Sequence, residues 1–342
     1  MSAPAFLAEY ARLAEPRLRA FLEGKRRVFE ASPVDLRDAH ALLRDYVLRG
    51  GKRLRGALVL VGHRAAGGAG QSAEVALDAS LGVELLHAYL LIHDDFMDRD
   101  ELRRGGPTLH RSLGGDHVGG SLALLLGSLC QAWAYELVLR HGDATAAAQA
   151  MTRTLEEVTL GQMADVRAPA GAPLDGQQVL ELQRLKTGSY TFDLPLRTGA
   201  LLGHASPALL GALSAYAQPL GQAFQIADDL LGTFGAPEVT GKPNASDLRE
   251  GKRTLLVARA LSLAAPADAA ALRSGLGRAD ASDAEIDALR AILRRSGAEE
   301  QCRADAQRLC AQALAALDSA PLPAAVRDDL RQIATYSVHR AL

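Results

Sequence analysis

Residues 87–108 read HAYLLIHDDFMDRDELRRGGPT and decide how the rest of the chain is interpreted. The first half has apolar residues on nearly every side of a helix, which predicts an element buried in a larger protein. Asp94, Asp95 and Asp98 are set into this apolar surface. Residues three or four apart are neighbours on a helix, and burial makes the repulsion between their charges costly. The pattern therefore predicts a bound cation, and oxygen ligands without cysteine favour Mg²⁺.

The second half of this stretch carries positive charge. Arg103 and Arg104 precede Gly105 and Gly106, so the acids are followed by a cationic fork on a flexible turn. Carboxylates that hold a metal beside arginines that bind an anion indicate a phosphate-binding site.

Residues 224–254, FQIADDLLGTFGAPEVTGKPNASDLREGKRT, repeat this design. An apolar helix carries Asp228 and Asp229, and the loop after it carries Lys242, Lys252 and Arg253. Either acidic pair alone is also typical of an ordinary helix end. Two such helices, each followed by a basic loop, favour a functional site. The loop at 234–250 is long enough to form a lid.

Two shorter motifs add cations. In GGKRLR, residues 50–55, a paired-glycine turn leads into a helix with Lys52 and Arg55 one turn apart. A helix N-terminus favours anions, although a basic first turn is more commonly a solvated surface. Lys186 and Thr187 lie inside a helix expected over 177–203 and kinked near Pro195. A buried Lys186 needs a negative partner, and a solvated surface lysine is the alternative.

Composition limits the class of protein. The chain has 342 residues, of which 48% are hydrophobic and only 4% aromatic, so a core of alanine, leucine and valine favours an all-α protein of helices packed on helices. The net charge of −2 predicts no attraction to nucleic acid or to an anionic membrane. Three cysteines without CxxC spacing are typical of reduced thiols in a cytoplasmic protein.

We expect one domain over residues 1–342. The charged N-terminus lacks an apolar signal core. Residues 118–139 approach membrane-spanning length, but Gln131 and Glu136 within them favour a buried core helix, so no transmembrane segment is expected. The other helices are expected at 3–30, 34–49, 143–167 and 177–203, with one more between the GGKRLR turn and the glycine-rich run at 67–70 and with alanine-rich packing helices from 255 to 342.

Taken together, the motifs resemble the trans-isoprenyl diphosphate synthases of the polyprenyl synthetase family, most of all the bacterial geranylgeranyl and farnesyl diphosphate synthases. The matching parts are GGKRLR at 50–55, His87, DDFMD at 94–98, RRGGPT at 103–108, KTG at 186–188, FQIADD at 224–229, Lys242 and Lys252. They occur in the family's order, which makes the match specific.

The resemblance implies an all-α helical bundle of the isoprenoid-synthase type around a deep central cavity, usually in a homodimer. It implies condensation of isopentenyl diphosphate with dimethylallyl, geranyl or farnesyl diphosphate. Three Mg²⁺ ions would bind with the substrate, two of them at Asp94 and Asp98 and the third at Asp228. Asp95 and Asp229 belong to the same two metal motifs.

The resemblance also assigns the remaining residues. The catalytic set implied is Asp94, Asp98, Arg103, Lys186, Asp228 and Lys242, in which the three cations contact the allylic diphosphate. The residues implied for isopentenyl diphosphate are Lys52, Arg55, His87 and Arg104, with Lys252 near the diphosphates and with Thr187 and Gln225 beside the reacting carbons.

One position departs from the family pattern. The second motif commonly ends in aspartate, but its fifth position here is Gly232, so the run is DDLLG. The change removes one carboxylate and predicts a weaker third metal site, in which Asp229 carries less weight. Because Mg²⁺ readily keeps several waters, Asp228 with water and phosphate oxygens can suffice.

Product length is expected to depend on Tyr89 and Leu90. Tyr89 lies five residues before Asp94, roughly 7.5 Å back along the helix. In the family, a bulky aromatic residue at this position is typical of enzymes with short products. The sequence also resembles geranylgeranyl synthases in lacking a two-residue insertion in DDFMD. We expect a C20 product, with C15 as the alternative. The other interpretation of Tyr89 is that it is a simple core residue.

Three other classes were weighed. A class I terpene cyclase shares the bundle and the first acidic motif, but it would carry an Asn/Ser/Glu metal triad and has no reason to keep GGKRLR. A non-catalytic synthase subunit typically loses the first motif, which is intact here. A plain structural bundle does not explain six ordered polar motifs.

Overall fold

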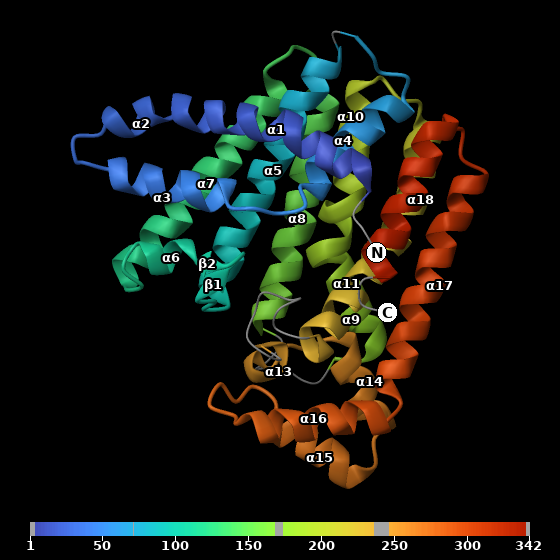
Figure 1. Ribbon diagram of the computed structural model, residues 1–342. Helices are drawn as coiled ribbons and strands as arrows, with labels where there is room; N and C mark the ends of the chain where they lie inside the picture. Colours follow the sequence, from blue (N-terminus) through green and yellow to red (C-terminus); the bar gives the residue numbers. More distant parts are fainter. Residues whose placement is uncertain (1–3, 71, 168–173, 236–245, 340–342) are drawn as a thin grey trace. The chain divides into compact units, whose positions relative to one another are not determined.

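The computed structural model describes residues 4–70, 72–167, 174–235 and 246–339 (Figure 1). The chain divides into two compact units. The N-terminal unit comprises Ala3–Ala150 and Pro195–Ser206, and the C-terminal unit comprises chiefly Met151–Leu194 and Pro207–Leu342. Lys242 and most of the expected lid lie outside the described residues. The single domain and the deep cavity stay predictions.

The N-terminal unit is built from helices and one small hairpin. Its elements are α1 (Ala5–Gly24), α2 (Arg26–Glu30), α3 (Arg37–Leu48), α4 (Leu54–Ala65), α5 (Ser72–Met97), β1 (Leu102–Arg103), β2 (Gly106–Pro107), α6 (Leu109–Ser112), α7 (His117–Leu139) and most of α10 (Leu194–Leu202). Helix α8 (Thr145–Arg167) begins in this unit and continues into the C-terminal unit.

Helices α5 and α7 pack closely because glycine leaves room between them. A Cβ atom at Gly82 of α5 would lie 2.7 Å from the Ala134 carbonyl oxygen of α7. A Cβ atom at Gly127 of α7 would lie 2.7 Å from the His93 ring of α5. Any larger residue at these positions would push the two helices apart.

The C-terminal unit is entirely helical in the residues described. Its elements are the rest of α8, α9 (Gly176–Gln183), a π-helical segment η2 (Arg184–Asp193), α11 (Pro207–Phe234), α13 (Ser246–Glu250), α14 (Leu255–Leu263), α15 (Pro266–Gly275), α16 (Asp283–Arg295), α17 (Ala298–Asp318) and α18 (Ala324–His339). Helix α11 packs against α17, η2 and α18, and the buried Tyr216 donates a hydrogen bond of 2.7 Å to the Leu330 carbonyl.

The all-α prediction is confirmed, and most helix boundaries fall within a few residues of those expected. Two expected helices differ. The first divides at Lys25 into α1 and α2. The helix expected over 177–203 consists of α9, η2 and α10, so the irregularity is a run of wide π-helical turns that ends at Asp193, just before Pro195. The sequence pattern does not distinguish π turns from α turns.

Two helices, Ala73–Met97 and His117–Leu139, are long and apolar enough to cross a membrane by length and composition alone. Core helices pass the same test. The apolar window of α5 is 72% buried, but that of α7 is only 44% buried. The helix predicted at 118–139 packs on α5 with one face and leaves Val118 and Leu125 exposed on the other.

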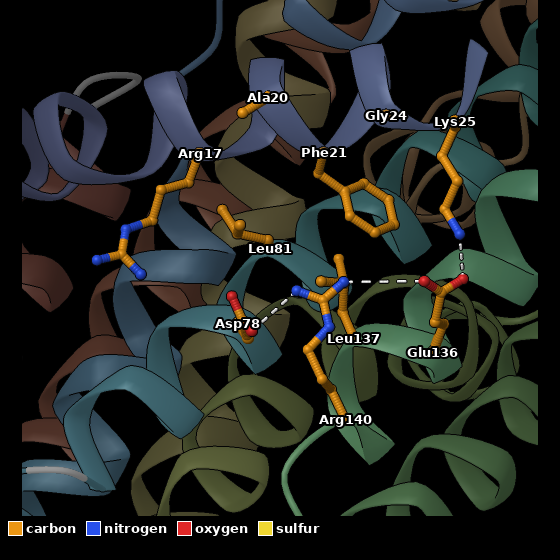
Figure 2. Close-up of a pocket in the computed structure, with 10 residues that line it drawn as sticks. All are labelled: Arg17, Ala20, Phe21, Gly24, Lys25, Asp78, Leu81, Glu136, Leu137 and Arg140. Carbon is orange, nitrogen blue, oxygen red and sulfur yellow. Dashed lines mark hydrogen bonds and ion pairs between the residues drawn. The ribbon is translucent and has the colours of Figure 1, made fainter. Parts of the chain in front are cut away.

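A pocket of about 480 Å³ lies between α1, α5 and α7 (Figure 2). It is lined by Arg17, Ala20, Phe21, Gly24, Lys25, Asp78, Leu81, Glu136, Leu137 and Arg140. Each charged lining residue has an ionic partner: Figure 2 shows Lys25 with Glu136 and Arg140 with both Asp78 and Glu136, and Arg17 pairs with Glu74. Asp78 lies sixteen residues before Asp94, roughly 24 Å away along α5. We interpret the pocket as an ion-paired junction of three helices.

Candidate active site

The C-terminal end of α5 presents three faces, because successive residues turn by about 100° around a helix. His87, Leu91, Asp94 and Asp98 fall on one face, and Leu90 borders it. Glu84 and Asp95 fall on a second face, directed at α3 and α4. Tyr89, His93 and Phe96 fall on a third face, and the last two of these contact α7. One helix thus separates an acidic face from two packing faces.

Asp95 is fully buried and is already engaged within the protein. Its carboxylate accepts a hydrogen bond of 2.6 Å from the Tyr46 hydroxyl and one of 2.7 Å from the Nε atom of Arg103. Burial raises the pKa of Asp95, and the Arg103 charge opposes that rise. Both carboxylate oxygens serve these partners, so Asp95 positions Arg103 in this arrangement. A metal-binding role for Asp95 stays a prediction.

The run RRGG forms a defined hairpin, although the sequence suggested a flexible turn. Arg104 and Gly105 both have positive φ, 52° and 72°, between the paired strands β1 and β2. Positive φ at both central residues is the geometry of a type I′ turn. Arg49, the residue that follows α3, donates to the Pro107 carbonyl at 2.7 Å and braces the hairpin.

This hairpin brings Arg104 to the turn that precedes α4. The Arg104 guanidinium donates to the Gly50 carbonyl at 2.9 Å and lies where a side chain at Gly51 would be. The start of α4 also contributes Arg55, whose guanidinium lies 3.2 Å from the Nε2 atom of His87. Lys52 is exposed beside them. The residues predicted to bind isopentenyl diphosphate therefore lie together in the N-terminal unit.

The electrostatics of this cluster favour an anion. Burial, together with the charges of Arg55 and Arg104, holds the pKa of His87 well below its usual value, so the imidazole is neutral at pH 7. Burial and the nearby Arg53 charge also lower the pKa of Arg104. Concentrated positive charge in a partly buried site is stabilised when a phosphate group binds.

Glu84 holds this cluster in place, although it was not among the residues predicted for the site. It forms a buried ion pair with Arg53, and both side chains are only 3% exposed. Its other oxygen accepts from the Gly56 backbone nitrogen at 2.8 Å. Arg53 has a φ of 47° at the start of α4, so the Glu84 pair fixes a backbone conformation that is unfavourable for a residue with a side chain. Its only sequence signal is an acid within an apolar helix.

In the C-terminal unit, α11 carries the second acidic pair. Asp229 is buried and accepts hydrogen bonds from the side-chain nitrogens of Gln183 and Gln225, at 2.6 and 2.8 Å. Burial and the charge of Asp247 raise the pKa of Asp229 well above its usual value. Asp229 therefore orients Gln225 and, like Asp95, has protein partners for both carboxylate oxygens. A metal-binding role for Asp229 stays a prediction. Asp228 is half-buried beside it.

Asp247 of α13 fills the space that Gly232 leaves. A Cβ atom at Gly232 would lie 2.6 Å from the Oδ2 atom of Asp247. Lys252 is close by, with its Nζ atom 2.9 Å from a Glu250 oxygen and 4.0 Å from an Asp247 oxygen. A carboxylate thus stands next to the glycine that departs from the family pattern, and the sequence analysis missed it because it comes from a different element.

Lys186 has the negative partner that its burial required. Its ammonium group donates to the Asp165 carboxylate of α8 at 2.6 Å, and the two side chains are about one-fifth exposed. Thr187 is half-buried next to it on η2. The η2 backbone lies against α11, where a Cβ atom at Gly221 would be 2.7 Å from the Cα atom of Gly188.

Among the described residues, no three His, Cys, Asp or Glu side chains are close enough to hold a metal ion by themselves. The donors are nevertheless of the right kind, since Asp94 and Asp98 lie one turn apart and offer only oxygen. Mg²⁺ is usually bound by one or two carboxylates together with water and substrate phosphates. The residues fit a site that the substrate completes.

Known proteins are similar to this chain in sequence. The family model for polyprenyl synthetase matches residues 38–293. A (2E,6E)-farnesyl diphosphate synthase from Mycobacterium tuberculosis is 35% identical over 295 residues, covering 85% of this chain and 80% of that protein. A short chain isoprenyl diphosphate synthase from Methanothermobacter thermautotrophicus is 32% identical, covering 98% of this chain and 97% of that protein.

Solved structures are similar over nearly the whole chain. A geranylgeranyl pyrophosphate synthase from Corynebacterium glutamicum, complexed with isoprenyl diphosphate and magnesium, has a TM-score of 0.93 and 36% identity, with 98% of this chain and 99% of that chain covered. A polyprenyl synthase from Caulobacter crescentus, complexed with calcium and isoprenyl diphosphate, has a TM-score of 0.83 and 29% identity, with 98% of each chain covered. The chain therefore belongs to the polyprenyl synthetase family and is a short-chain trans-prenyltransferase.

Proposed function

We propose that this enzyme condenses isopentenyl diphosphate with dimethylallyl, geranyl and farnesyl diphosphates, in a Mg²⁺-dependent reaction, to all-trans geranylgeranyl diphosphate. One observation carries the proposal: the partly buried guanidinium groups of Arg55 and Arg104, beside the neutral His87, lie at the same end of α5 as Asp94 and Asp98. A cation-binding face beside an anion-binding cluster is what two diphosphate substrates require.

In this proposal the acidic residues divide into two groups. Asp94 and Asp98 hold two Mg²⁺ ions, and Asp228 holds a third. Asp95 and Asp229 position neighbouring side chains, because protein donors occupy their oxygens. The complexes of related synthases with magnesium or calcium support the use of a divalent ion.

The reaction breaks the bond between the allylic C1 carbon and oxygen, and the electron pair leaves with the diphosphate. Bound Mg²⁺ supplies positive charge to that leaving group. Arg103 and Lys186, with Lys242, stabilise the same developing charge. Asp95 and Asp165 hold the first two of these cations in place beforehand.

The second substrate supplies the nucleophile. The alkene of isopentenyl diphosphate forms the new carbon–carbon bond, and the proton lost afterwards goes to the released diphosphate. Lys52, Arg55, His87 and Arg104 hold the diphosphate of this substrate, with Lys252 near both diphosphates. Thr187 and Gln225 lie beside the reacting carbons, and Asp229 fixes the Gln225 amide. The reaction therefore needs no side-chain nucleophile.

An assay with isopentenyl diphosphate and each of the C5, C10 and C15 primers, with and without Mg²⁺, tests the proposal. We expect each primer to be elongated to C20 only with the metal. Termination at C15 would make the enzyme a farnesyl diphosphate synthase. A hydrocarbon formed from geranylgeranyl diphosphate alone would indicate a terpene cyclase, and activity only with a second protein would indicate a non-catalytic subunit.

Asp94→Ala is the matching variant. Removing a metal-binding carboxylate should lower turnover by about 10³-fold or more, which corresponds to roughly 4 kcal/mol of lost transition-state stabilisation. The far-ultraviolet circular dichroism should not change. Asp143→Ala removes an exposed acid outside the site and is the control. Wild-type turnover in Asp94→Ala would exclude the metal role.

Product length is assigned to Tyr89 and Leu90. Tyr89 lies on the face of α5 that packs toward α7, and Leu90 lies nearer the face of Asp94. The substitution Tyr89→Ala removes the aromatic ring and should give products longer than those of the wild type. Product length is measured by chromatography of the dephosphorylated alcohols. Unchanged lengths would leave Tyr89 as a core residue.

We further propose a homodimer formed through the exposed face of α7. Val118, Leu122, Leu125 and Leu129 follow the spacing of a single helix face, and the first and third of these are more than 60% exposed. Two copies of one apolar stripe can cover each other about a two-fold axis. A cytoplasmic location also stays a prediction, and the three buried, unpaired cysteines are in keeping with it.

A further inference from the structure

Tyr89 contacts His93, a residue that has no role in the proposed reaction. The ring of His93, one turn further along α5, packs against the Tyr89 ring with 4.5 Å between the centroids and an interplanar angle of 60°. Long side chains on a helix lean toward its N-terminus and cover the residue four positions earlier. His93 is therefore the side chain expected to restrict the position of the Tyr89 ring.

His93 is itself fixed to a second helix. Its Nε2 atom lies 3.1 Å from the Leu124 carbonyl oxygen of α7, within hydrogen-bond distance. Gly127, one turn further along α7, lets the imidazole approach the α7 backbone, because a Cβ atom there would lie 2.7 Å from the ring. An aromatic pair on one helix is thus anchored to the backbone of the next.

We infer that His93 is a positioning residue that sets product length through Tyr89. The inference rests on the proposed function, in which Tyr89 limits chain growth. The Leu124 carbonyl holds the His93 imidazole, and the imidazole holds the Tyr89 ring at the edge of the space into which the product grows. A tyrosine without this support has more rotamers available and blocks a growing chain less often.

The alternative is that His93 only fills the contact between α5 and α7. A filling role predicts a loss of stability without a change of product. A positioning role predicts that the effect of His93 on product length depends on the presence of the Tyr89 ring. A double-mutant cycle separates the two.

The experiment compares wild type, His93→Leu, Tyr89→Ala and the double variant, using isopentenyl diphosphate, a C15 primer and Mg²⁺. His93→Leu should raise the ratio of longer to shorter products by about three- to tenfold, the factor that corresponds to one lost hydrogen bond. In the Tyr89→Ala background the same change should have no further effect. His93→Asn, too short to reach the Leu124 carbonyl, should behave like His93→Leu and provides a second variant if one folds poorly.

His40→Leu is the matched control. His40 also lies within hydrogen-bond distance of a helix carbonyl, 2.9 Å from the Leu22 oxygen, and contacts an aromatic ring, that of Phe29. It lies on α3, outside the proposed site. The control should lower the thermal midpoint and leave product length unchanged.

Three results would overturn the inference. If both His93 variants give products of wild-type length, His93 only fills the contact between α5 and α7. Equal lengthening in the presence and absence of the Tyr89 ring would show that His93 acts independently. Lengthening in His40→Leu would show that any loss of stability changes the product. An inactive wild-type enzyme would instead contradict the proposed function, so the two failures are distinguishable.

Discussion

At the scale of single residues, the second aspartate of each acidic pair accepts hydrogen bonds from two protein side chains. Asp95 accepts from Tyr46 and Arg103, and Asp229 accepts from two glutamines. A sequence presents the two acids of a pair as equivalent. On a helix the second acid is turned about 100° away from the first, so the two side chains face different surroundings.

Whether the Asp247 carboxylate takes the place of the aspartate that the family commonly has at position 232 can be tested by moving the carboxylate from position 247 to position 232. Gly232→Asp alone places a side chain against the Asp247 carboxylate, and crowding of this kind costs about 1–3 kcal/mol. Adding Asp247→Ala removes both the crowding and the like charge. We expect the double variant to recover most of the lost stability and the wild-type Mg²⁺ requirement, measured by denaturant unfolding and by the Mg²⁺ concentration at half-maximal rate.

Asp247→Ala by itself is the control for that exchange, and it should raise the Mg²⁺ requirement. If the double variant needs as much Mg²⁺ as Asp247→Ala does, the two carboxylates do not substitute for one another.

At the scale of elements, α5 organises the N-terminal unit by assigning a different task to each face. The acidic face carries Asp94 and Asp98, the second face carries Glu84 and Asp95 toward α3 and α4, and the third packs on α7. Apolar periodicity alone predicted a buried helix. The division into faces needed the neighbouring helices, since it is their contacts that distinguish one buried face from another.

Glu84→Gln tests how the second face supports the site. The change leaves the buried Arg53 charge without its counter-ion, which should cost about 3–5 kcal/mol in urea unfolding. The KM for isopentenyl diphosphate should rise more than kcat falls, because the start of α4 positions Arg55. Glu74→Gln removes an exposed ion pair from the same helix and should cost less than about 1 kcal/mol. If the two variants change the unfolding free energy and the KM equally, Glu84 does not support the site.

At the scale of the whole molecule, the exposed face of α7 makes assembly testable. Leu125→Glu places a charge in the proposed homodimer interface and should shift the protein toward monomer in analytical ultracentrifugation. Leu13→Glu alters an equally apolar but separate exposed position on α1 and should leave the dimer intact. A monomeric wild type, or a dimer that survives Leu125→Glu, would contradict the interface.

The sequence by itself determined the all-helical class, most helix boundaries, the family and the elements that carry the acidic motifs. These depend on composition, spacing and periodicity, which act over a few turns of chain. For Lys186 the sequence left open a negative partner or a solvated surface position, and Asp165 is a negative partner in the structure.

Only the tertiary structure decided which side chains contact Asp95 and Asp229, that Glu84 fixes the cationic turn, and that Asp247 stands beside Gly232. It also decided the orientation of Arg104, through a hairpin that folds back on residues some fifty positions earlier. The physical reason is common to all of these. Each arises from a contact between side chains distant in sequence, whose partners are selected by packing rather than by local pattern.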